Sequence, residues 1–560
     1  MRAWCLQRRY DILFTLLMIC IACHDISKSY GFYFPADEFG YWSYAARLAG
    51  YDWSDIASLS SYYSYGYSLI LLPVFLLIKD AVTAYRTALF VNFALLAVCF
   101  FLLQKMGKTF YAAVAAFYPT WIFYAGTTFA EILVVALYLV ICILLLKYLQ
   151  TDQKWYLTLM IAAMLYLYFV HMRTVGVLLS GVIVLLVYRV KRGGEKIRYM
   201  SALIMGMTFA FAVGILIKNY WTGMVYGDTE NALKNANDYA GQFDKIVYIF
   251  SEEGLVNLII SVSGKLLYLG LASFGTAYLG IVYALRGVKK GRCFPLFVLF
   301  STMAAVMICA VYTIHPGRVD TLTYGRYHEY VMPVLIMMGI KELRAKSMAA
   351  NKAVCRIAVI LGIEAVMTCL VVISLRQNGQ MSFFGNTICG ISWLYDPDSF
   401  KPVSFYWRVY LVYAVLTSMA CMGIWWTGRR KGREVFLMFL VAMQIVIGIR
   451  LSTMYIDAAR LGCYRDTLIV QKIHELNPEG DREVYYSTGG EDFGNIGILQ
   501  FMMRDTSIHI VKKDYDLGTH DDSDLLLIDY RSDQAHMLEE KYGDHLMNGH
   551  FTLYYNDDRE

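Results

Sequence analysis

Two adjacent carboxylates, Asp37 and Glu38, follow the first apolar stretch of the chain in the segment FPADEFGYWSYAARLAG. A third carboxylate, Glu131, opens a later apolar stretch, TTFAEILVVALYL. A positioned carboxylate can take the proton of a reacting hydroxyl and act as a general base. The three acids are therefore candidate catalytic residues. The alternative is that they only occupy a helix N-terminus or the boundary of a membrane span, where acids are also favoured.

Cationic side chains accompany these acids near the ends of apolar stretches. The planar fork of Arg can bond two phosphate oxygens, and Lys binds phosphate as a point charge. The alternative is that they lie at a membrane interface with their charged ends in water. Acids and cations at one surface favour transfer of a group from a phosphate to an alcohol. The candidate phosphate-binding residues are Arg86, Arg173, Lys218, Arg318 and Arg326.

The elements that must position these residues are predicted to lie in a membrane. Of the 560 residues, 58% are hydrophobic and 17% are charged, and the apolar runs are too long and too numerous for a soluble core. The net charge of +5 is small, and the basic residues form short clusters between apolar runs, which gives no support to a nucleic-acid partner. Arg8 and Arg9 precede an apolar stretch that we interpret as a first span, because it lacks the small residues of a cleavage site.

Basic clusters predict the orientation of the chain, because short cytoplasmic loops are enriched in Lys and Arg. Neighbouring clusters must then be separated by an even number of spans. This holds if the short stretch Gly66 to Ile78 is a re-entrant or interfacial helix, and if Trp155 to Tyr188 is two spans with a turn at 171–173. The result is about 13 spans, a cytoplasmic N-terminus and an extracytoplasmic C-terminus. The clusters are Arg2 to Arg9, Lys105 to Lys108, Arg189 to Arg198, Arg286 to Arg292, Lys341 to Arg356 and Arg429 to Arg433.

The chain is predicted to have two domains. Residues 1–451 form the membrane domain, which includes a first extracytoplasmic loop at 31–85, and residues 452–560 form a small extracytoplasmic α/β domain. In the second domain we expect strands at Val484 to Tyr486, Ile508 to Val511, Leu525 to Ile528 and Phe551 to Tyr555. We expect helices at Arg465 to Leu476, Phe493 to Met503 and Ala535 to Met547. A further outer loop, Arg376 to Phe405, has no role that its residues indicate.

The membrane region up to about Tyr330 resembles the GT-C superfamily of polyprenyl-phosphate-dependent glycosyltransferases. This superfamily includes protein O-mannosyltransferases, lipid A aminoarabinose transferase and arabinofuranosyltransferases. The residues that carry the resemblance are the acidic pair Asp37-Glu38, the tyrosine-rich stretch SSYYSYGYSLILLP, the acid Glu131 at the start of a later span, and the short segment YGRYHEYVMP. The resemblance implies a helical polytopic membrane protein of this fold in the cell membrane.

The resemblance also implies an activity, which is inverting sugar transfer from a polyprenyl-phosphate donor to an acceptor hydroxyl outside the cytoplasm. Asp37 would be the base, Glu38 and Glu131 would orient substrate or hold a divalent cation, and the Arg residues, Arg326 among them, would bind the donor phosphate. His328-Glu329 is a further candidate for metal binding, although a dense metal-ligand spacing such as HExxH is missing. Whether a metal is required stays open.

Two other classes of protein compete with this hypothesis. A membrane transporter or lipid or polysaccharide flippase would also place charges in a chain of many spans, but here the charges gather at the outer ends of spans. A membrane scaffold or receptor would need far fewer spans. The sequence leaves open which sugar is moved and whether the acceptor is a glycan, a lipid or a protein.

Overall fold

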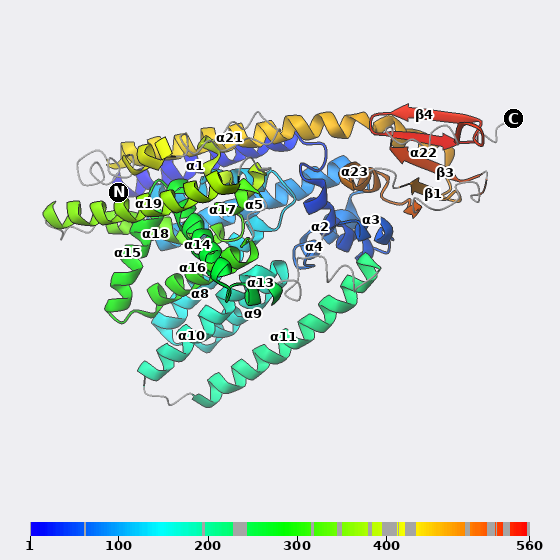
Figure 1. Cartoon of the computed structure of the whole chain (residues 1–560). Coiled ribbons are helices and arrows are strands. Elements are labelled where there is room, and N and C mark those ends of the chain that lie inside the picture. The colour runs from blue at the N-terminus through cyan, green and yellow to red at the C-terminus, as the bar shows by residue number, and fades with distance from the viewer. Residues whose placement is uncertain are drawn as a thin grey trace.

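The structure of the chain is a computed structural model. It describes residues 2–60, 63–192, 197–227, 243–314, 318–343, 350–378, 384–394, 411–412, 414–419, 433–487, 493–511, 521, 523–529 and 538–556. Figure 1 shows a body of helices with a small β-sheet at one end, and a long helix, α21, runs along the body to that sheet. Residues 379–383 and 395–405 of the predicted loop Arg376 to Phe405 lie outside the described residues, as do parts of the basic clusters Arg189 to Arg198, Lys341 to Arg356 and Arg429 to Arg433.

Long apolar helices make up most of the body. Within the described ranges, nine helices are long and apolar enough to cross a membrane. This agrees with the predicted polytopic helical fold, whereas the total of about thirteen spans stays a prediction. The nine are α1 (Arg2–Lys28), α5 (Ala81–Met106), α8 (Glu131–Thr151), α10 (Val175–Lys191), α11 (Ile197–Tyr226), α14 (Glu252–Ala272), α16 (Cys293–Tyr312), α19 (Ala350–Asn378) and α21 (Arg433–Arg465).

The predicted break between Trp155 and Tyr188 is confirmed. Helix α9 (Lys154–Val170) ends before His171, whose backbone is extended, and the short 3-10 helix η1 (Met172–Thr174) leads into α10. The hydroxyl of Thr174 satisfies two backbone carbonyls at the break, because it donates to the carbonyl of Leu167 at 3.1 Å and to that of His171 at 2.8 Å. Which side of the membrane this turn faces stays a prediction.

Shorter helices fill the space between the spans. Helices α15 and α18 approach so closely that a Cβ on Gly280 would lie 2.2 Å from the carbonyl oxygen of Leu335, and one on Gly339 would lie 2.0 Å from that of Thr276. Small residues permit such close helix packing in membranes. The short helices are α6 (Thr109–Ala116), α7 (Pro119–Ala125), α13 (Phe243–Tyr248), α15 (Thr276–Lys289), α17 (Val319–Leu322), η3 (Glu329–Val331), α18 (Met332–Leu343), η4 (Gly385–Thr387) and η5 (Cys389–Leu394).

The segment predicted as the first outer loop folds into three short helices, α2 (Pro35–Leu48), α3 (Ser54–Ser58) and α4 (Ser68–Leu77). Helix α4 has 10 residues, about 15 Å of helix, which is half the hydrocarbon thickness. The expected short helix at Gly66 to Ile78 is therefore confirmed in length, and α4 packs on α2. The loop before α4 is fixed to the end of α9, because the amide of Gly66 donates to the carbonyl of Phe169 at 2.9 Å.

The C-terminal part is a small α/β unit, as predicted. Its five-stranded sheet has the order β2-β1-β3-β5-β4, in which β1 pairs in parallel with β2 and β3, and β5 pairs antiparallel with β3 and β4. The strands are β1 (Val484–Ser487), β2 (Ile508–Val511), β3 (Leu525–Asp529), β4 (Asp544–Asn548) and β5 (Phe551–Tyr555), and the helices are α22 (Thr467–Leu476) and α23 (Phe493–Met503). Helix α21 runs continuously across residue 452, so no break in secondary structure marks the predicted domain boundary there. The boundary stays a prediction.

One predicted element of this unit is wrong. The expected helix Ala535 to Met547 ends in strand β4, and residues 535–537 lie outside the described part. Strand β4 forms a hairpin with β5, in which Asn548 pairs with Phe551 and Gly549 takes a φ of 62° between them. Glycine with positive φ at the first central position suits a two-residue hairpin turn. This turn and the pairing with β5 outweigh the weak helical pattern.

Candidate active site

Glu38 anchors the helix that carries both predicted acids. Its side chain is fully buried. Oε1 accepts hydrogen bonds from the amides of Tyr33 (2.6 Å) and Phe34 (3.0 Å), which precede α2. Oε2 accepts from the Tyr85 hydroxyl (2.9 Å) and from the amide and hydroxyl of Thr128 (2.8 and 2.6 Å). Burial raises the pKa of Glu38, while these five bonds favour its charged form. Glu38 therefore ties α2 to α5 and to the turn before α8.

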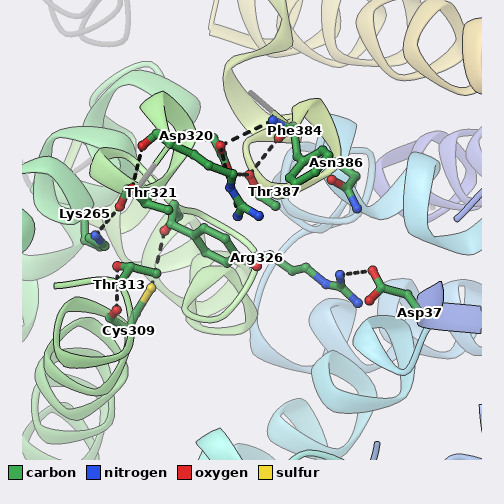
Figure 2. Close-up of polar contacts among 12 residues, drawn as sticks. Asp37, Lys265, Cys309, Thr313, Asp320, Thr321, Arg326, Phe384, Asn386 and Thr387 are labelled. Atoms are coloured by element: carbon green, nitrogen blue, oxygen red, sulfur yellow. Dashed lines mark hydrogen bonds and ion pairs between the residues drawn. The ribbon is translucent and has the colours of Figure 1, made fainter. Parts of the chain in front are cut away.

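Asp37 points the other way, into a hollow. Its side chain is 21% exposed. Oδ1 accepts a hydrogen bond from the Tyr63 hydroxyl, and Oδ2 accepts one from Arg326 Nη1 at 2.5 Å, a contact visible in Figure 2. Tyr63 reaches Asp37 because Gly40 lies one turn further along α2. A Cβ on Gly40 would lie 2.1 Å from the Tyr63 ring.

Arg326 joins two of the predicted acids. Its Nη1 binds Asp37 and its Nε binds Oε1 of Glu131. Its own backbone is fixed as well, because the amide of Arg326 donates to the carbonyl of Thr387 at 3.1 Å. Burial opposes the charge of the guanidinium, but the carboxylates of Asp37 and Glu131 outweigh it and raise the pKa of Arg326. The site therefore holds a buried cation between two acids from distant parts of the chain.

A cavity of about 720 Å³ opens beside this cluster. This volume is within the range of small-molecule sites in proteins. The lining combines one acid with three cations, and most of the other residues are aromatic or polar. The lining residues are Tyr33, Phe34, Pro35, Ala36, Asp37, Tyr63, Lys245, Tyr312, Thr313, Arg318, Thr321, Tyr324, Arg326, Tyr327, Phe384, Asn386, Thr387 and Gly494.

Lys245 and Arg318 supply the other two positive charges. Lys245 Nζ donates to the carbonyl of Tyr312 at 2.8 Å, and burial, then the charge of Arg173, lowers the pKa of Lys245. Arg318 forms two bonds to the buried carboxylate of Asp320, at 3.1 and 3.0 Å. Asp320 also accepts from the Thr387 hydroxyl at 2.7 Å, as Figure 2 shows. A phosphate in this cavity would meet cations that come from separate segments.

Arg173 lies beside the cavity rather than in its wall. Its guanidinium carbon is 3.7 Å from the ring centroid of Tyr312 and 3.5 Å from that of Tyr327, and this stacking favours the cation. Arg173 and Arg326 both line a smaller adjoining pocket of about 40 Å³. His171 lines it too, and burial, then the charges of Arg173 and Arg326, lower the pKa of His171 well below its ordinary value.

Two of the predicted phosphate-binding cations are not brought to the cavity. Arg86 donates to the carbonyls of Ser29 (2.8 Å) and Ser27 (3.1 Å), next to the end of α1. Lys218 is buried in α11 with 4% of its surface exposed. Neither residue lines the cavity. Arg86 has a structural explanation, since the end of a helix leaves carbonyls that need donors.

The candidate metal ligands Glu38 and Glu131 do not belong to a cluster of possible ligands in the part of the chain that the structure describes. Within the described residues, no group of three His, Cys, Asp or Glu side chains could hold a metal ion. Glu38 already accepts five hydrogen bonds and Glu131 is paired with Arg326, so the two residues do not fit a shared cation. A requirement for a divalent cation stays a prediction.

His328 and Glu329 face the protein interior. Oε1 of Glu329 accepts from the hydroxyls of Tyr118 (2.6 Å), Thr120 (2.8 Å) and Tyr268 (2.5 Å). Burial raises the pKa of Glu329 to about 7 and lowers the pKa of His328 to about 3. Neither residue lines the cavity, so their sequence motif marks a buried polar centre.

Three residues of the site were not singled out in the sequence. Tyr63 belongs to the tyrosine-rich stretch, but its spacing does not distinguish it from its neighbours. Lys245 was within a predicted outer loop, where a single Lys is common, and Asn386 lies in a loop without a pattern. Only the fold brings these residues to Asp37, because 26 or more residues separate each of them from it along the chain.

The chain is similar to known proteins in its fold and not in a detectable family sequence. No protein-family model matches the sequence, and no curated protein matches it. The structure of ArnT from Cupriavidus metallidurans in the apo state has a TM-score of 0.50 at 11% identity and covers 97% of both chains. The structure of the same protein bound to undecaprenyl phosphate has a TM-score of 0.56 at 12% identity and covers 98% of both chains. The chain therefore has the fold of ArnT.

Proposed function

We propose that this chain is an integral membrane glycosyltransferase that moves a sugar from a polyprenyl-phosphate donor to an acceptor hydroxyl. The observation that carries the proposal is the cavity whose wall holds Asp37 and Arg326 together with Lys245 and Arg318. A base and three cations on one wall suit a reaction in which a hydroxyl loses a proton and a phosphate gains charge. The shared fold with ArnT, solved with undecaprenyl phosphate bound, supports a lipid phosphate as the carrier.

In the proposed reaction, the acceptor oxygen attacks the anomeric carbon of the donor sugar. The carboxylate of Asp37 takes the hydroxyl proton as the new carbon–oxygen bond forms. The bond between the anomeric carbon and the phosphate oxygen breaks, and its electron pair leaves with the polyprenyl phosphate. Direct displacement of this kind inverts the anomeric configuration.

The cations act on the leaving group. The phosphate changes from a diester to a monoester and gains negative charge, which Lys245 and Arg318 would neutralise. Arg326 lies between this phosphate region and the base, so donor phosphate would compete with Asp37 for its guanidinium. Glu131 is a positioning residue in this scheme, since it holds the Nε edge of Arg326. Glu38 positions α2 and with it Asp37.

The proposed site faces away from the cytoplasm, as the basic clusters predict. The N-terminus would lie inside and the C-terminal domain outside, in a multi-pass protein of the cell membrane. A domain beside the site suits an extended acceptor, which is a glycan, a lipid or a protein. Whether the sugar is a hexose or a pentose depends on the cavity once donor is bound.

The test is a transfer assay on the purified full chain. Labelled polyprenyl-phosphate sugars are added with candidate acceptors, and release of polyprenyl phosphate is measured together with glycosylated product. We expect the two in equal amounts, and a fall in turnover of about 10² to 10⁴ in Asp37→Asn, as for loss of a general base. The exposed Asp52→Asn is the matched control and should keep its turnover. Normal turnover of Asp37→Asn in folded protein would contradict the mechanism.

A further inference from the structure

A second large hollow lies at the opposite end of the helical body from the candidate active site. Its volume is about 670 Å³. Glu131, the first residue of α8, binds Arg326 at the active site, whereas Leu149 and Gln150 near the end of α8 line the second hollow. Helix α8 has 21 residues, so the two sites are about 30 Å apart, the thickness of the hydrocarbon core.

Positive charge surrounds this second hollow. The five cations come from the ends of several helices, and no acid is among the lining residues in the part of the chain that the structure describes. Lys191 donates to the carbonyl of Gly291 at 3.0 Å, which fixes the α10 end against the turn before α16. Arg192 lies 3.9 Å from the carboxylate of Asp152, and the other four like charges repel each other and favour an anion. The cations are Lys105, Lys191, Arg192, Arg292 and Lys341.

Part of the wall of the same hollow is apolar. The ends of α8, α16 and α18 contribute Leu146, Leu149, Phe294, Met337 and Met338 to it. A free phosphate ion would gain nothing from such a wall. A lipid with a charged headgroup and an acyl chain would use both parts of the hollow, because its chain gains free energy on contact with apolar surface.

We propose that this hollow binds the headgroup of an anionic phospholipid at the membrane face opposite to the active site. Basic pockets between membrane helices bind phosphate headgroups of this kind. The cations belong to clusters that the sequence predicts to be cytoplasmic, and the cytoplasmic leaflet carries anionic lipid. The lipid would bridge the ends of α5, α8, α10, α16 and α18.

The experiment compares lipid retention by the purified full chain in native mass spectrometry. The probes are phosphatidylglycerol, phosphatidylcholine and inorganic phosphate. The test variant is Lys105→Gln/Lys191→Gln/Arg292→Gln. The control variant, Lys108→Gln/Lys147→Gln/Lys289→Gln, removes the same charge from exposed cations at the same end of the body that do not line the hollow.

We expect phosphatidylglycerol to be retained in preference to phosphatidylcholine by the native chain and by the control variant. Each cation that lines the hollow contributes about fivefold to binding of the headgroup, so the test variant should bind on the order of a hundredfold more weakly. The control cations do not line the hollow, so their loss should have a much smaller effect. Equal loss of phosphatidylglycerol binding in both variants would mean that general surface charge explains the binding, and it would overturn the proposal. Equal retention of the two lipids, or displacement by inorganic phosphate at matched phosphate concentration, would also overturn it.

Discussion

The arrangement of the acids in the candidate active site depends on the guanidinium of Arg326. It is buried, and its two edges bind carboxylates from α2 and α8. Removal of either partner from a buried charge pair leaves an uncompensated charge. Lys at this position would keep the charge but reach only one carboxylate at a time, because its single nitrogen cannot replace the fork. The site therefore needs Arg here for geometry as well as for charge.

Donor binding should distinguish Lys245 from Arg86. Lys245 lines the cavity, while Arg86 binds backbone carbonyls beside the end of α1. Lys245→Gln removes a cation from the proposed phosphate site and should raise the donor KM by about tenfold, the effect of roughly 1.4 kcal/mol of lost phosphate attraction. Arg86→Gln should leave the donor KM unchanged and lower the Tm instead. A raised donor KM in Arg86→Gln with an unchanged donor KM in Lys245→Gln would instead assign phosphate binding to Arg86 and not to Lys245.

Glu329 predicts a pH dependence of stability. Its pKa rises from 4.5 to about 7 on burial, so the folded chain binds this proton more tightly than the unfolded chain. The stabilisation is complete below about pH 4.5 and is lost as the pH rises through about 7, a change on the order of 3 kcal/mol. Gln stays neutral and still accepts from the three hydroxyls.

The measurement is the Tm of native protein and Glu329→Gln at about pH 5 and about pH 8. We expect the Tm of the variant, relative to the native chain, to be higher at the upper pH than at the lower. Glu540→Gln, which alters an exposed carboxylate, is the control and should show no such shift. A constant difference between Glu329→Gln and the native chain would contradict the assignment.

Charge beside an apolar stretch predicts a candidate site residue, but it does not predict that residue's partner. The prediction that Asp37, Glu131, Arg318 and Arg326 are site candidates rested on charge next to apolar stretches, because charge is costly in a membrane. The structure places Asp37, Arg318 and Arg326 on the wall of one cavity, and Glu131 binds Arg326. The same argument also selected Arg86 and Lys218, since the cost of charge does not say whether the partner is a ligand or a backbone carbonyl. Glu38 and Asp37 are adjacent on a helix, so their opposite environments depend on tertiary packing.

At the scale of elements, the C-terminal domain holds the helices of the first loop. Arg504 follows the end of α23 and donates to the carbonyls of Phe75 and Ile78 at the end of α4. Its own carbonyl accepts from Trp53 Nε1 at 3.0 Å. The hydroxyl of Ser507 donates to the carbonyl of Asp52 at 2.7 Å. Because α4 packs on α2, these contacts act on the helix that carries Asp37.

Arg504 offers a sharp test of this coupling, because its φ of 34° is a backbone conformation that glycine adopts more easily. Arg504→Ala removes the charged donors from two helix-end carbonyls and should destabilise the protein by about 2 kcal/mol. Arg504→Gly should recover up to about 1 kcal/mol of that loss by relieving the backbone. Tm in detergent and protease cleavage of the first loop measure both.

Lys472→Ala, on the same domain but away from the first loop, is the control for the Arg504 variants. It should change the Tm little, because Lys472 is partly exposed and its ion pair with Glu475 spans 3.7 Å. If Arg504→Gly were more stable than the native chain, backbone strain would dominate and the carbonyl bonds would contribute little.

Elements were predicted well where a local pattern decides them. The strands at 484–487, 508–511 and 525–529 follow short apolar runs between polar turns, and each has buried residues at both ends. The helix predicted at 535–547 failed because β4 is an edge strand in which none of the five residues is buried, so its sequence carries little alternation. Pairing with β5 stabilises it, and such pairing is invisible in a local window.

Across the whole molecule, the two hollows differ in charge, because one contains Asp37 and the other is lined by cations without an acid among the described residues. The cavity beside Asp37 and the basic hollow near Lys341 lie at opposite ends of the same helices. The basic end corresponds to the clusters that the sequence places in the cytoplasm. The orientation follows from charge, whereas the hollows follow from how helices from distant parts of the chain pack. The fold alone does not fix which end faces the cytoplasm, so the orientation requires its own measurement.

Cysteine labelling in intact cells tests that orientation, and the structure decides which positions can report it. Lys218 and Asp320 were predicted to face outward but are buried, so they would resist labelling from either side. Lys105→Cys and Lys290→Cys are exposed at the basic end, and Asp52→Cys and Asp521→Cys are exposed on the first loop and the C-terminal domain. A reagent that does not cross membranes should label only the last two, and all four after permeabilisation. Labelling of Lys105→Cys in intact cells would show that the predicted orientation is wrong. The candidate active site would then face the cytoplasm.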